Sequence, residues 1–362
     1  MIKVDKKVIA RMNKCYAICL LESGGEKSFL VATEKEGDCR RFDIEGNPIE
    51  TIWTEPGGVM TMVQIPNGNG AFLSTQKFYS PNNSSEAKIV IAEPIDNTGK
   101  KVNSLKEKHT WRIKTLCQMP YIHRFDIIPG GNKYYIIACT IKSDHKYKDD
   151  WRYPGKIWVR ELPESFDAYD ADAGNPMEFD LLQDGLLKNH GYGRFEKDGK
   201  VCSLIGAENG LFKVSPPNEE EAQWQIKKIL DRPTSDVRAI DIDGDGKNEY
   251  MIFSPFHGSD LSFYKESKDG LEAFYHHSED LPFLHALWAG EIKNKASFIL
   301  GHRGGDRDLM LASWNDSTNK IEFTILDHDR GPANVLAYNI DGQDFIVATN
   351  RETNEVALYK LK

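Results

Sequence analysis

A pair of short β-strand patterns joined by a tight turn recurs seven times along the chain. Each member is a run of β-branched, aromatic and aliphatic residues bounded by Gly, Asn or Asp, which is typical of a strand between two turns. The first strands of the pairs are predicted at 15–21, 60–65, 122–128, 189–195, 237–243, 284–290 and 333–339. The second strands are predicted at 28–34, 71–77, 134–140, 202–208, 249–255, 297–303 and 344–350.

Further strand patterns extend most pairs to four strands. Third strands are predicted at 88–93, 156–162, 210–215, 261–266, 309–314 and 356–361. A charged fourth strand is predicted before each first strand, for example at 109–116, 224–230 and 320–326. Four strands per unit, with most units about 45 to 50 residues apart, is the pattern of a propeller blade. The sequence therefore predicts an all-β fold, a seven-bladed propeller of four-stranded antiparallel blades. We expect residues 1–362 to form one domain.

The two ends of the chain complement each other. The segment 6–12 looks like a fourth strand without a blade of its own, and the chain stops after a third strand at 356–361. We predict that the N-terminal strand joins the last blade and closes the ring, which removes exposed sheet edges.

Composition and charge exclude several classes of function. The net charge of −9 and the pI near 5.7 argue against a nucleic-acid binder, which usually carries a basic stripe. No apolar run approaches the roughly 18 residues of a membrane span, and charges interrupt the first residues where a signal peptide is apolar. The six cysteines lack a CxxC pair and suit buried thiols in a reducing compartment. We therefore predict a cytoplasmic protein with no nucleic-acid or membrane partner.

The turn DIDGDGKNEY, from Asp241 to Tyr250, first suggests half of an EF-hand. Position 12 of such a loop would be Ile252 instead of a glutamate, and strand patterns flank the turn where an EF-hand has helices. Two interpretations stay open for the acidic side chains of this turn. They coordinate a structural Ca²⁺, or they cap backbone N–H groups in a plain hairpin turn. The residues concerned are Asp241, Asp243, Asp245 and Glu249.

The segment 241–265, from this turn through the next two strands, resembles an FG-GAP/VCBS-type repeat. This repeat is the blade unit of integrin-like and many bacterial seven-bladed propellers. The resemblance implies a calcium ion at the turn between the first two strands, away from the opposite face of the blades. Only the fifth blade carries the motif intact, and the turns at 126–135 and 338–347 are degenerate versions.

Aligning the seven first strands by their turns brings polar residues into one column at the strand starts. The column consists of Tyr16, Thr61, His123, His190, Arg238, His285 and Asn334. The ends of the second strands add Glu34, Lys77, Lys142, Glu208, His257, His302, Arg303, Asn350 and Arg351. Five of the chain's ten histidines thus fall in equivalent positions, so we predict a cationic, histidine-rich mouth at one end of the propeller channel. The alternative is a solvated rim of the channel.

Such a mouth suits elimination chemistry on an anionic or carbonyl-bearing substrate. Histidine exchanges a proton near neutral pH, arginine clamps a carboxylate, and neutral histidines hold a divalent metal. Together these groups would remove a proton next to a carbonyl and stabilise the enolate. The chain is also similar to the propeller part of the aldos-2-ulose dehydratase group and to propeller polysaccharide lyases acting on uronates. Both resemblances imply a carbon–oxygen lyase acting on a small sugar, keto-sugar or uronate.

The candidate residues divide by role. The predicted catalytic residues are His123, His190, His285 and Tyr192, although Tyr192 is equally a packed inner-strand aromatic. A catalytic metal, of unknown identity, is predicted on His190, His285 and His302. Substrate contacts are predicted for Lys77, Lys142, Trp151, Arg194, Arg238, His257, His302, Arg303, Asn334 and Arg351. General base and metal ligand are not divided among the histidines.

Three other functions compete with the lyase hypothesis. A carbohydrate- or protein-binding propeller would keep the aromatic and arginine contacts without needing three histidines in one ring. A hydrolase with a serine nucleophile would usually show a GxSxG elbow, which the sequence lacks. A protein scaffold would more often expose apolar patches than a polar mouth.

Overall fold

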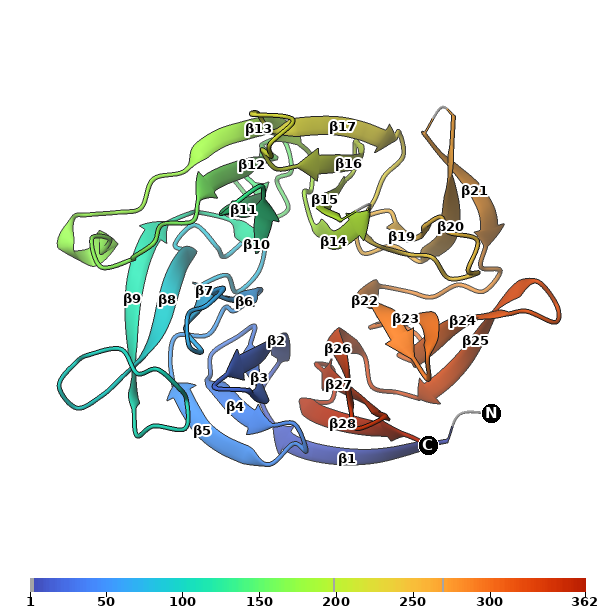
Figure 1. Cartoon of the computed structure of the whole chain (residues 1–362). Coiled ribbons are helices and arrows are strands. Elements are labelled where there is room, and N and C mark those ends of the chain that lie inside the picture. Colours follow the sequence, from blue (N-terminus) through green and yellow to red (C-terminus); the bar gives the residue numbers. More distant parts are fainter. Residues whose placement is uncertain (1–2, 198, 269) are drawn as a thin grey trace. The chain divides into compact units, whose positions relative to one another are not determined.

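The computed structural model describes residues 3–197, 199–268 and 270–362. Within these ranges the strands form seven four-stranded antiparallel sheets, and helix is confined to one 3-10 turn, Ala171–Ala173. The predicted all-β class with seven four-stranded blades is confirmed. The strands divide between two compact units, Met1–Arg11 with Lys188–Lys362, and Met12–Leu187. In Figure 1 the second unit runs from blue to green and the first from green to red, with β1 in blue.

The unit of Lys188–Lys362 with the N-terminal strand holds four sheets. One sheet consists of β14 (Gly191–Lys197), β15 (Lys200–Ala207), β16 (Gly210–Ser215) and β17 (Gln225–Leu230), and the next of β18 (Asp236–Ile240), β19 (Glu249–Ser254), β20 (Asp260–Ser267) and β21 (Gly270–His276). The third consists of β22 (Leu284–Ile292), β23 (Lys295–His302), β24 (Leu309–Asn315) and β25 (Lys320–Asp327). The last consists of β26 (Pro332–Ile340), β27 (Gln343–Asn350), β28 (Glu355–Leu361) and β1 (Val4–Arg11). First strands of consecutive sheets are neighbours, β14 with β18, β18 with β22, and β22 with β26.

The unit of Met12–Leu187 holds the other three sheets. Their strands are β2 (Cys15–Ser23), β3 (Glu26–Thr33), β4 (Cys39–Asp43) and β5 (Pro48–Trp53); β6 (Met62–Gln64), β7 (Phe72–Gln76), β8 (Lys88–Ile95) and β9 (Thr110–Gln118); and β10 (Ile122–Gly130), β11 (Lys133–Lys142), β12 (Pro154–Glu161) and β13 (Asp180–Leu186). Strand β4 is absent from the sequence-based prediction, and β6 is shorter than predicted.

The N-terminal strand completes the last sheet, as predicted. Strand β1 pairs antiparallel with β28, from Val4 opposite Leu361 to Arg11 opposite Glu355. The Lys6 ammonium reinforces this pairing by lying 2.8 Å from Asp327 Oδ2 and 3.1 Å from Glu355 Oε2. Residues from the two ends of the chain are therefore joined by both backbone pairing and ion pairs.

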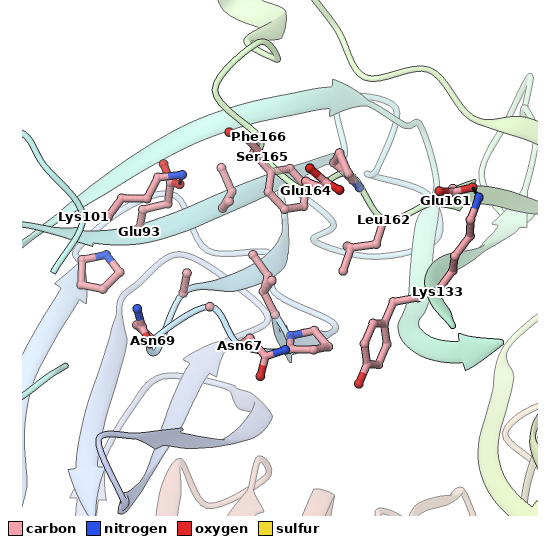
Figure 2. Close-up of a pocket in the computed structure, with 18 of the residues that line it drawn as sticks. Asn67, Asn69, Glu93, Lys101, Lys133, Glu161, Leu162, Glu164, Ser165 and Phe166 are labelled. Atoms are coloured by element: carbon pink, nitrogen blue, oxygen red, sulfur yellow. Dashed lines mark hydrogen bonds and ion pairs between the residues drawn. The ribbon is translucent and has the colours of Figure 1, made fainter. Parts of the chain in front are cut away.

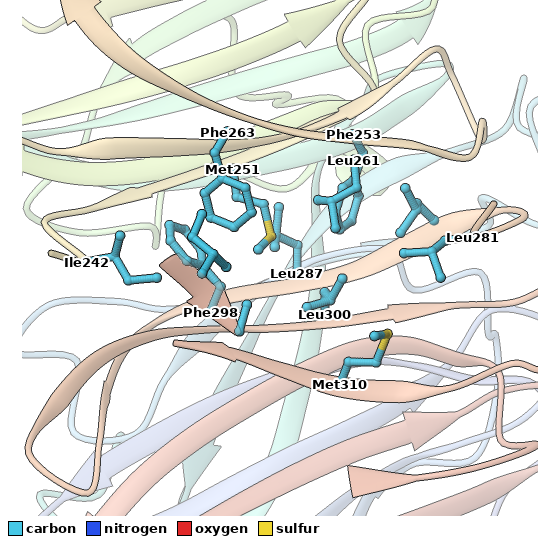
Figure 3. Close-up of a cluster of buried hydrophobic side chains, with 13 residues drawn as sticks. Ile242, Met251, Phe253, Leu261, Phe263, Leu281, Leu287, Phe298, Leu300 and Met310 are labelled. Carbon is cyan, nitrogen blue, oxygen red and sulfur yellow. The ribbon is translucent and has the colours of Figure 1, made fainter. Parts of the chain in front are cut away.

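The hydrophobic core lies between successive sheets, and β19 shows how the sequence builds it. All six residues of β19 are buried, because this strand has a neighbouring sheet on each face. Met251 and Phe253 pack on one face against the β22–β25 sheet (Figure 3). Tyr250 and Ile252 pack on the other face. This alternation follows the two-residue period of a strand. Residues drawn in Figure 3 include Ile242, Leu261, Phe263, Leu281, Leu287, Phe298, Leu300 and Met310.

All six cysteines are described, and all are buried as thiols. Burial raises the pKa of Cys19 and of Cys117 to about 12, so these thiols stay protonated at neutral pH. They act as small apolar core residues, as the sequence predicts. Among the described residues, no helix is long and apolar enough to cross a membrane.

Candidate functional site

Three histidines from three consecutive sheets converge in the unit of Lys188–Lys362. His190 precedes β14, His257 follows β19, and His285 lies near the start of β22. The ring centroids are 4.9 Å apart for His190 and His257, 5.5 Å for His257 and His285, and 5.6 Å for His190 and His285. One possible ligand nitrogen from each ring lies within 4.8 Å of the others. We call these three residues the histidine cluster.

Both buried members of the histidine cluster lie where a first strand begins, and a break in strand pairing positions His285. The register between β22 and β23 shifts between Leu284 and Ala286, so His285 is the extra residue of a β-bulge. Such a bulge re-aims the side chain of the inserted residue. His190 lies just before β14, where its backbone N–H donates to Gly206 O at 3.1 Å. The two side chains are only 1% and 2% exposed, whereas His257 is partly exposed.

Each buried histidine is fixed by the backbone of the next sheet. His190 Nδ1 lies 2.9 Å from Ser235 O, and His285 Nδ1 lies 2.7 Å from Ala333 O. Ser235 directly precedes β18, and Ala333 lies at the register shift of β26, so both hold the position that the histidines hold in their own sheets. Because a carbonyl oxygen only accepts, Nδ1 carries the hydrogen and Nε2 the lone pair. Metal-binding histidines are oriented by the same type of bond.

His257 reaches the cluster from a short loop instead of a strand. Its backbone has a φ of 53°, in the left-handed region that a residue with a side chain rarely adopts. Its backbone N–H donates to Ser235 Oγ at 3.2 Å. Its ring stacks between those of Phe256 and Phe283, with ring centroids 3.9 Å and 4.3 Å away. Strained backbone of this kind persists only where its surroundings hold it, and it gathers at functional sites.

Cationic side chains cover the two aromatic rings on either side of His257. Lys188 Nζ lies 5.5 Å from the centre of the Phe256 ring, and the Arg303 guanidinium lies 4.5 Å from the centre of the Phe283 ring. Both distances are within the range of a cation–π interaction. The stack therefore alternates cation, aromatic ring, imidazole, aromatic ring and cation.

Carboxylates pair with the cations around the cluster and offset part of the predicted positive charge. Lys188 lies 3.6 Å from Glu208. Glu352 Oε1 accepts from Arg303 at 2.7 Å and from Arg351 at 2.8 Å. The sequence pattern placed the basic residues correctly at the strand ends, but it did not show which acidic neighbour each one meets.

Arg238 and Asn334 lie outside the position that the predicted column assigned to them. Ser235 and Ala333 occupy it, and Arg238 and Asn334 come three residues and one residue later. Arg238 Nη1 donates to Val237 O at 2.7 Å and pairs with Asp236 at 3.2 Å. It braces β18 against β14 instead of pointing to the cluster, because it also donates to Tyr192 O.

The remaining candidates in this unit take structural positions. His302 donates from Nδ1 to Gly304 O at 2.9 Å and accepts the Asp308 N–H on Nε2 at 3.1 Å, so both ring nitrogens hold its own loop. His257 therefore takes the place that the prediction gave to His302 in a metal site. Tyr192 is buried, with its hydroxyl 2.8 Å from Ser203 Oγ, which agrees with the packed-aromatic alternative. Arg194 is exposed on β14.

His123 belongs to the unit of Met12–Leu187 and lies at a β-bulge of β10, as His285 does in β22. Its ring contacts Phe78 edge to face, with 5.1 Å between ring centroids. Thr61 Oγ1 donates to His123 O at 3.0 Å, the same sheet-to-sheet bond that the two buried histidines make. Bracing between sheets is therefore a general role of this position.

The other candidates in the same unit are paired locally. Lys77 lies 2.9 Å from Glu86 at the surface. Lys142 is fully buried, donates to Asp150 O at 2.9 Å, and has its ammonium 4.2 Å from the centre of the Trp151 ring. Burial lowers the pKa of Lys142. These contacts show how Lys142 and Trp151 order the loop between β11 and β12.

The predicted calcium residues lie at the opposite end of β19 from His257. Asp241, Asp243 and Glu249 offer carboxylate oxygens within 4.8 Å of one another. The Lys265 ammonium contacts this group, at 2.7 Å from Asp243 and 3.4 Å from Glu249. A cation of the chain itself thus lies among the predicted ligands.

A pocket of about 620 Å³ lies in the unit of Met12–Leu187, between the sheets that begin with β6 and β10 (Figure 2). Apolar walls from Ile65, Leu162 and Phe166 face a rim of amides and charges. The buried Glu93 pairs with Lys101 at 2.8 Å, and Lys133 pairs with Glu161 at 2.7 Å. Apolar walls with a few polar groups at the rim suit the binding of a small ligand.

The structure adds residues that sequence reasoning did not assign to the site. Ser235 holds His190 and His257, and Phe256 and Phe283 stack on either side of His257. Glu208 Oε1 accepts the Phe256 N–H at 3.0 Å. Glu208 was among the second-strand ends, where its position was a usable signal. The others lie in loops whose shape no strand pattern predicts.

No protein-family model matches the chain, and no curated protein matches it by sequence. Solved structures match its fold over nearly the whole length. They include virginiamycin B lyase from Staphylococcus aureus, with a TM-score of 0.59, 11% identity and coverage of 100% of this chain and 99% of that one. The Dos1 propeller has a TM-score of 0.55, 9% identity and coverage of 99% and 95%. The Cps50 (Swd1) β-propeller domain of Myceliophteria thermophila has a TM-score of 0.57, 10% identity and coverage of 98% and 99%. At these identities the similarity concerns the fold alone, and the chain has the fold of a seven-bladed β-propeller.

Proposed function

We propose that the protein is a carbon–oxygen lyase that removes water or another leaving group from a small sugar, keto-sugar or uronate at the histidine cluster. The observation that carries the proposal is the convergence of His190, His257 and His285, with Nδ1 of the two buried rings fixed by backbone carbonyls. This donor set fits a divalent transition metal, since imidazole suits such metals and catalytic sites often have three protein ligands.

The roles in the proposed reaction follow from position and exposure. A bound metal would polarise a substrate carbonyl or carboxylate oxygen. His190 and His285 would hold it from the buried side, and His257 from the partly exposed side. Glu208 is the proposed proton acceptor, because its carboxylate is held at 3.0 Å from the Phe256 N–H, next to His257. Glu208 would take the proton from the carbon next to the carbonyl or carboxylate, a carbon–carbon double bond would form, and the carbon–oxygen bond at the neighbouring carbon would break. The protonated Glu208 would return its proton to the departing oxygen, so that water or an alcohol leaves.

Two resemblances support this reading without assigning any residue. The acidic turn at 241–250 resembles that of FG-GAP/VCBS repeats. The chain also resembles the propeller part of the aldos-2-ulose dehydratase group. One structural neighbour is by name a lyase, virginiamycin B lyase. The neighbour supports only the idea that a propeller of this size can carry lyase chemistry, since fold alone does not give function.

A non-catalytic carbohydrate- or protein-binding propeller is the second candidate. The pocket in Figure 2 favours it, because four of its charged groups form the pairs Glu93–Lys101 and Lys133–Glu161. Tyr134, which also lines the pocket, is 38% exposed. An exposed aromatic ring beside amide groups suits contact with a sugar or a peptide. The lyase proposal remains first because the pocket does not account for the histidine cluster.

The test combines metal analysis with an assay for elimination. The purified protein is analysed for bound metals, and its action on uronic acids and keto-sugars is followed by the ultraviolet absorbance of the conjugated product. We expect one transition metal per chain and new absorbance, both lost in His285→Ala and both kept in His276→Ala, which changes an exposed histidine. Metal-free protein that changes no sugar, even after metal is added, contradicts the proposal and favours the binding propeller.

A further inference from the structure

The acidic turn between β18 and β19 contains a cation that belongs to the chain. Lys265, on the adjacent strand β20, places Nζ 2.7 Å from Asp243 Oδ2, 3.3 Å from Asp245 Oδ2 and 3.4 Å from Glu249 Oε1. Its side chain is 31% exposed, whereas that of Glu249 is fully buried. The ammonium thus contacts three of the four carboxylates that the FG-GAP/VCBS resemblance assigns to calcium.

Hydrogen bonds within the turn already use the same carboxylates. Asp241 accepts the N–H groups of Gly244 and Gly246, each at 2.8 Å, and Glu249 Oε2 accepts the Ile242 N–H at 2.9 Å. Calcium takes six to eight oxygen ligands. Here backbone N–H groups bond to Asp241 and Glu249 Oε2, and the ammonium lies beside Glu249 Oε1, which has no hydrogen-bond partner among the described residues. The chain's own cation therefore occupies the place of an ion, and the donor set does not fit calcium while Lys265 stays there.

Electrostatics keep the lysine charged. Partial burial works to lower the pKa of Lys265, but hydrogen bonds to Asp243 and Asp245 and the charge of Glu249 outweigh burial and raise that pKa. A divalent ion at the same place would face the repulsion of an ammonium or have to displace it.

We infer that Lys265 replaces calcium in this turn, so that the turn is a calcium-independent brace in the native protein and becomes a calcium site when the lysine is removed. The geometry of the turn suits a cation, and the chain supplies that cation from the neighbouring strand. The inference is independent of the proposed lyase activity, because His257 and this turn lie at opposite ends of β19.

The experiment compares thermal unfolding of wild type, Lys265→Gln and Lys265→Arg in chelator, in millimolar Mg²⁺ and in millimolar Ca²⁺. Calcium titration calorimetry is run on the same three proteins. Wild type and Lys265→Arg are expected to show the same Tm in all three solutions and no calcium binding. Lys265→Gln is expected to unfold at a lower Tm in chelator, to regain several degrees with Ca²⁺, and to respond less to Mg²⁺.

Two results overturn the inference. A calcium-dependent Tm or a calcium isotherm in wild type shows that the lysine does not exclude the ion. A folded Lys265→Gln that ignores calcium shows that the ammonium does not occupy a calcium position. The wild-type measurements decide the first point even if Lys265→Gln does not fold.

Discussion

The carbonyl oxygen of Ser235 lies 2.9 Å from Nδ1 of His190, at the junction of two neighbouring sheets. The hydroxyl of the same serine accepts the backbone N–H of His257 at 3.2 Å. One buried serine therefore positions two members of the histidine cluster, one through its backbone and one through its side chain. This separation allows the two effects to be tested apart.

Ser235→Ala should loosen His257 and leave His190 in place. The substitution keeps the carbonyl and removes the hydroxyl, so we expect metal affinity to fall by about tenfold, the lower end of the range for outer-shell partners. The lost hydrogen bond should lower the free energy of unfolding by about 1 kcal/mol. Metal titration and urea unfolding measure the two effects. Ser262→Ala, another buried serine in the same unit, is the control and should leave metal affinity unchanged.

Glu208→Gln should separate metal binding from turnover. Glutamine still accepts the Phe256 N–H, so the loop and the bound metal should stay, but the proton acceptor is lost. We expect turnover to fall by roughly 10² to 10⁴, the usual size of a general-base contribution. Rate and metal content are measured on the same sample. Full activity in this variant would rule out Glu208 as the base.

Glu352→Gln should expose the repulsion between two guanidinium groups. Arg303 and Arg351 share Oε1 of Glu352, and the side chain of each is 11% exposed. With the shared charge removed, the free energy of unfolding should fall by about 1 to 3 kcal/mol. Sulfate should restore part of the Tm, more than it raises that of wild type. An equal effect of sulfate on both proteins would contradict this role for Glu352.

Stability in acid should depend on Lys6 and Asp327. Burial works to raise the pKa of Asp327, but the Lys6 ammonium, the Tyr359 hydroxyl and Arg330 outweigh it and hold that pKa below its ordinary value. Because the pKa of this carboxyl is lower in the folded than in the unfolded protein, its ionised form stabilises the fold at pH values above its pKa in the unfolded chain, near 4. This stabilisation is lost as the pH falls through the pKa that the group has in the folded protein. Lys6→Gln should therefore be less stable than wild type at pH 6, and the gap should narrow below about pH 4. A gap that stays constant from pH 7 to pH 2 would contradict the assignment.

The sequence predicted the blades well and the site only in part, for a physical reason. The apolar run at 249–255 indicates a strand that is buried on both faces, and β19 is buried in this way. This burial determines where the strand lies, whatever the conformation of the loops that follow it. The closure by β1 followed from the same counting of strands. His190 and His285 were found because they begin strands, but the strand alignment could not see the bulge at Ala333 that displaces Asn334 from the column.

Loop geometry accounts for the rest of the difference. His257 reaches the cluster through a left-handed backbone and two stacked rings, and no periodic pattern encodes either feature. In the sequence, His302 lies at the end of a second strand, as His257 does. In the structure, both of its ring nitrogens bond to its own loop. Lys265 lies on a strand that the sequence predicted, yet its contact with the acidic turn appears only when β19 and β20 are paired.

The most direct test of the histidine cluster is a Co²⁺ titration followed by visible absorption, with wild type, His257→Ala and His276→Ala side by side. Cobalt accepts the same imidazole ligands as zinc, and its ligand-field bands report the number and arrangement of those ligands. We predict one Co²⁺ per chain with the intense bands of a low-coordinate site in wild type and His276→Ala, and loss of these bands in His257→Ala. Weak bands of hydrated cobalt in wild type, or an unchanged spectrum in His257→Ala, would contradict a metal site at His190, His257 and His285.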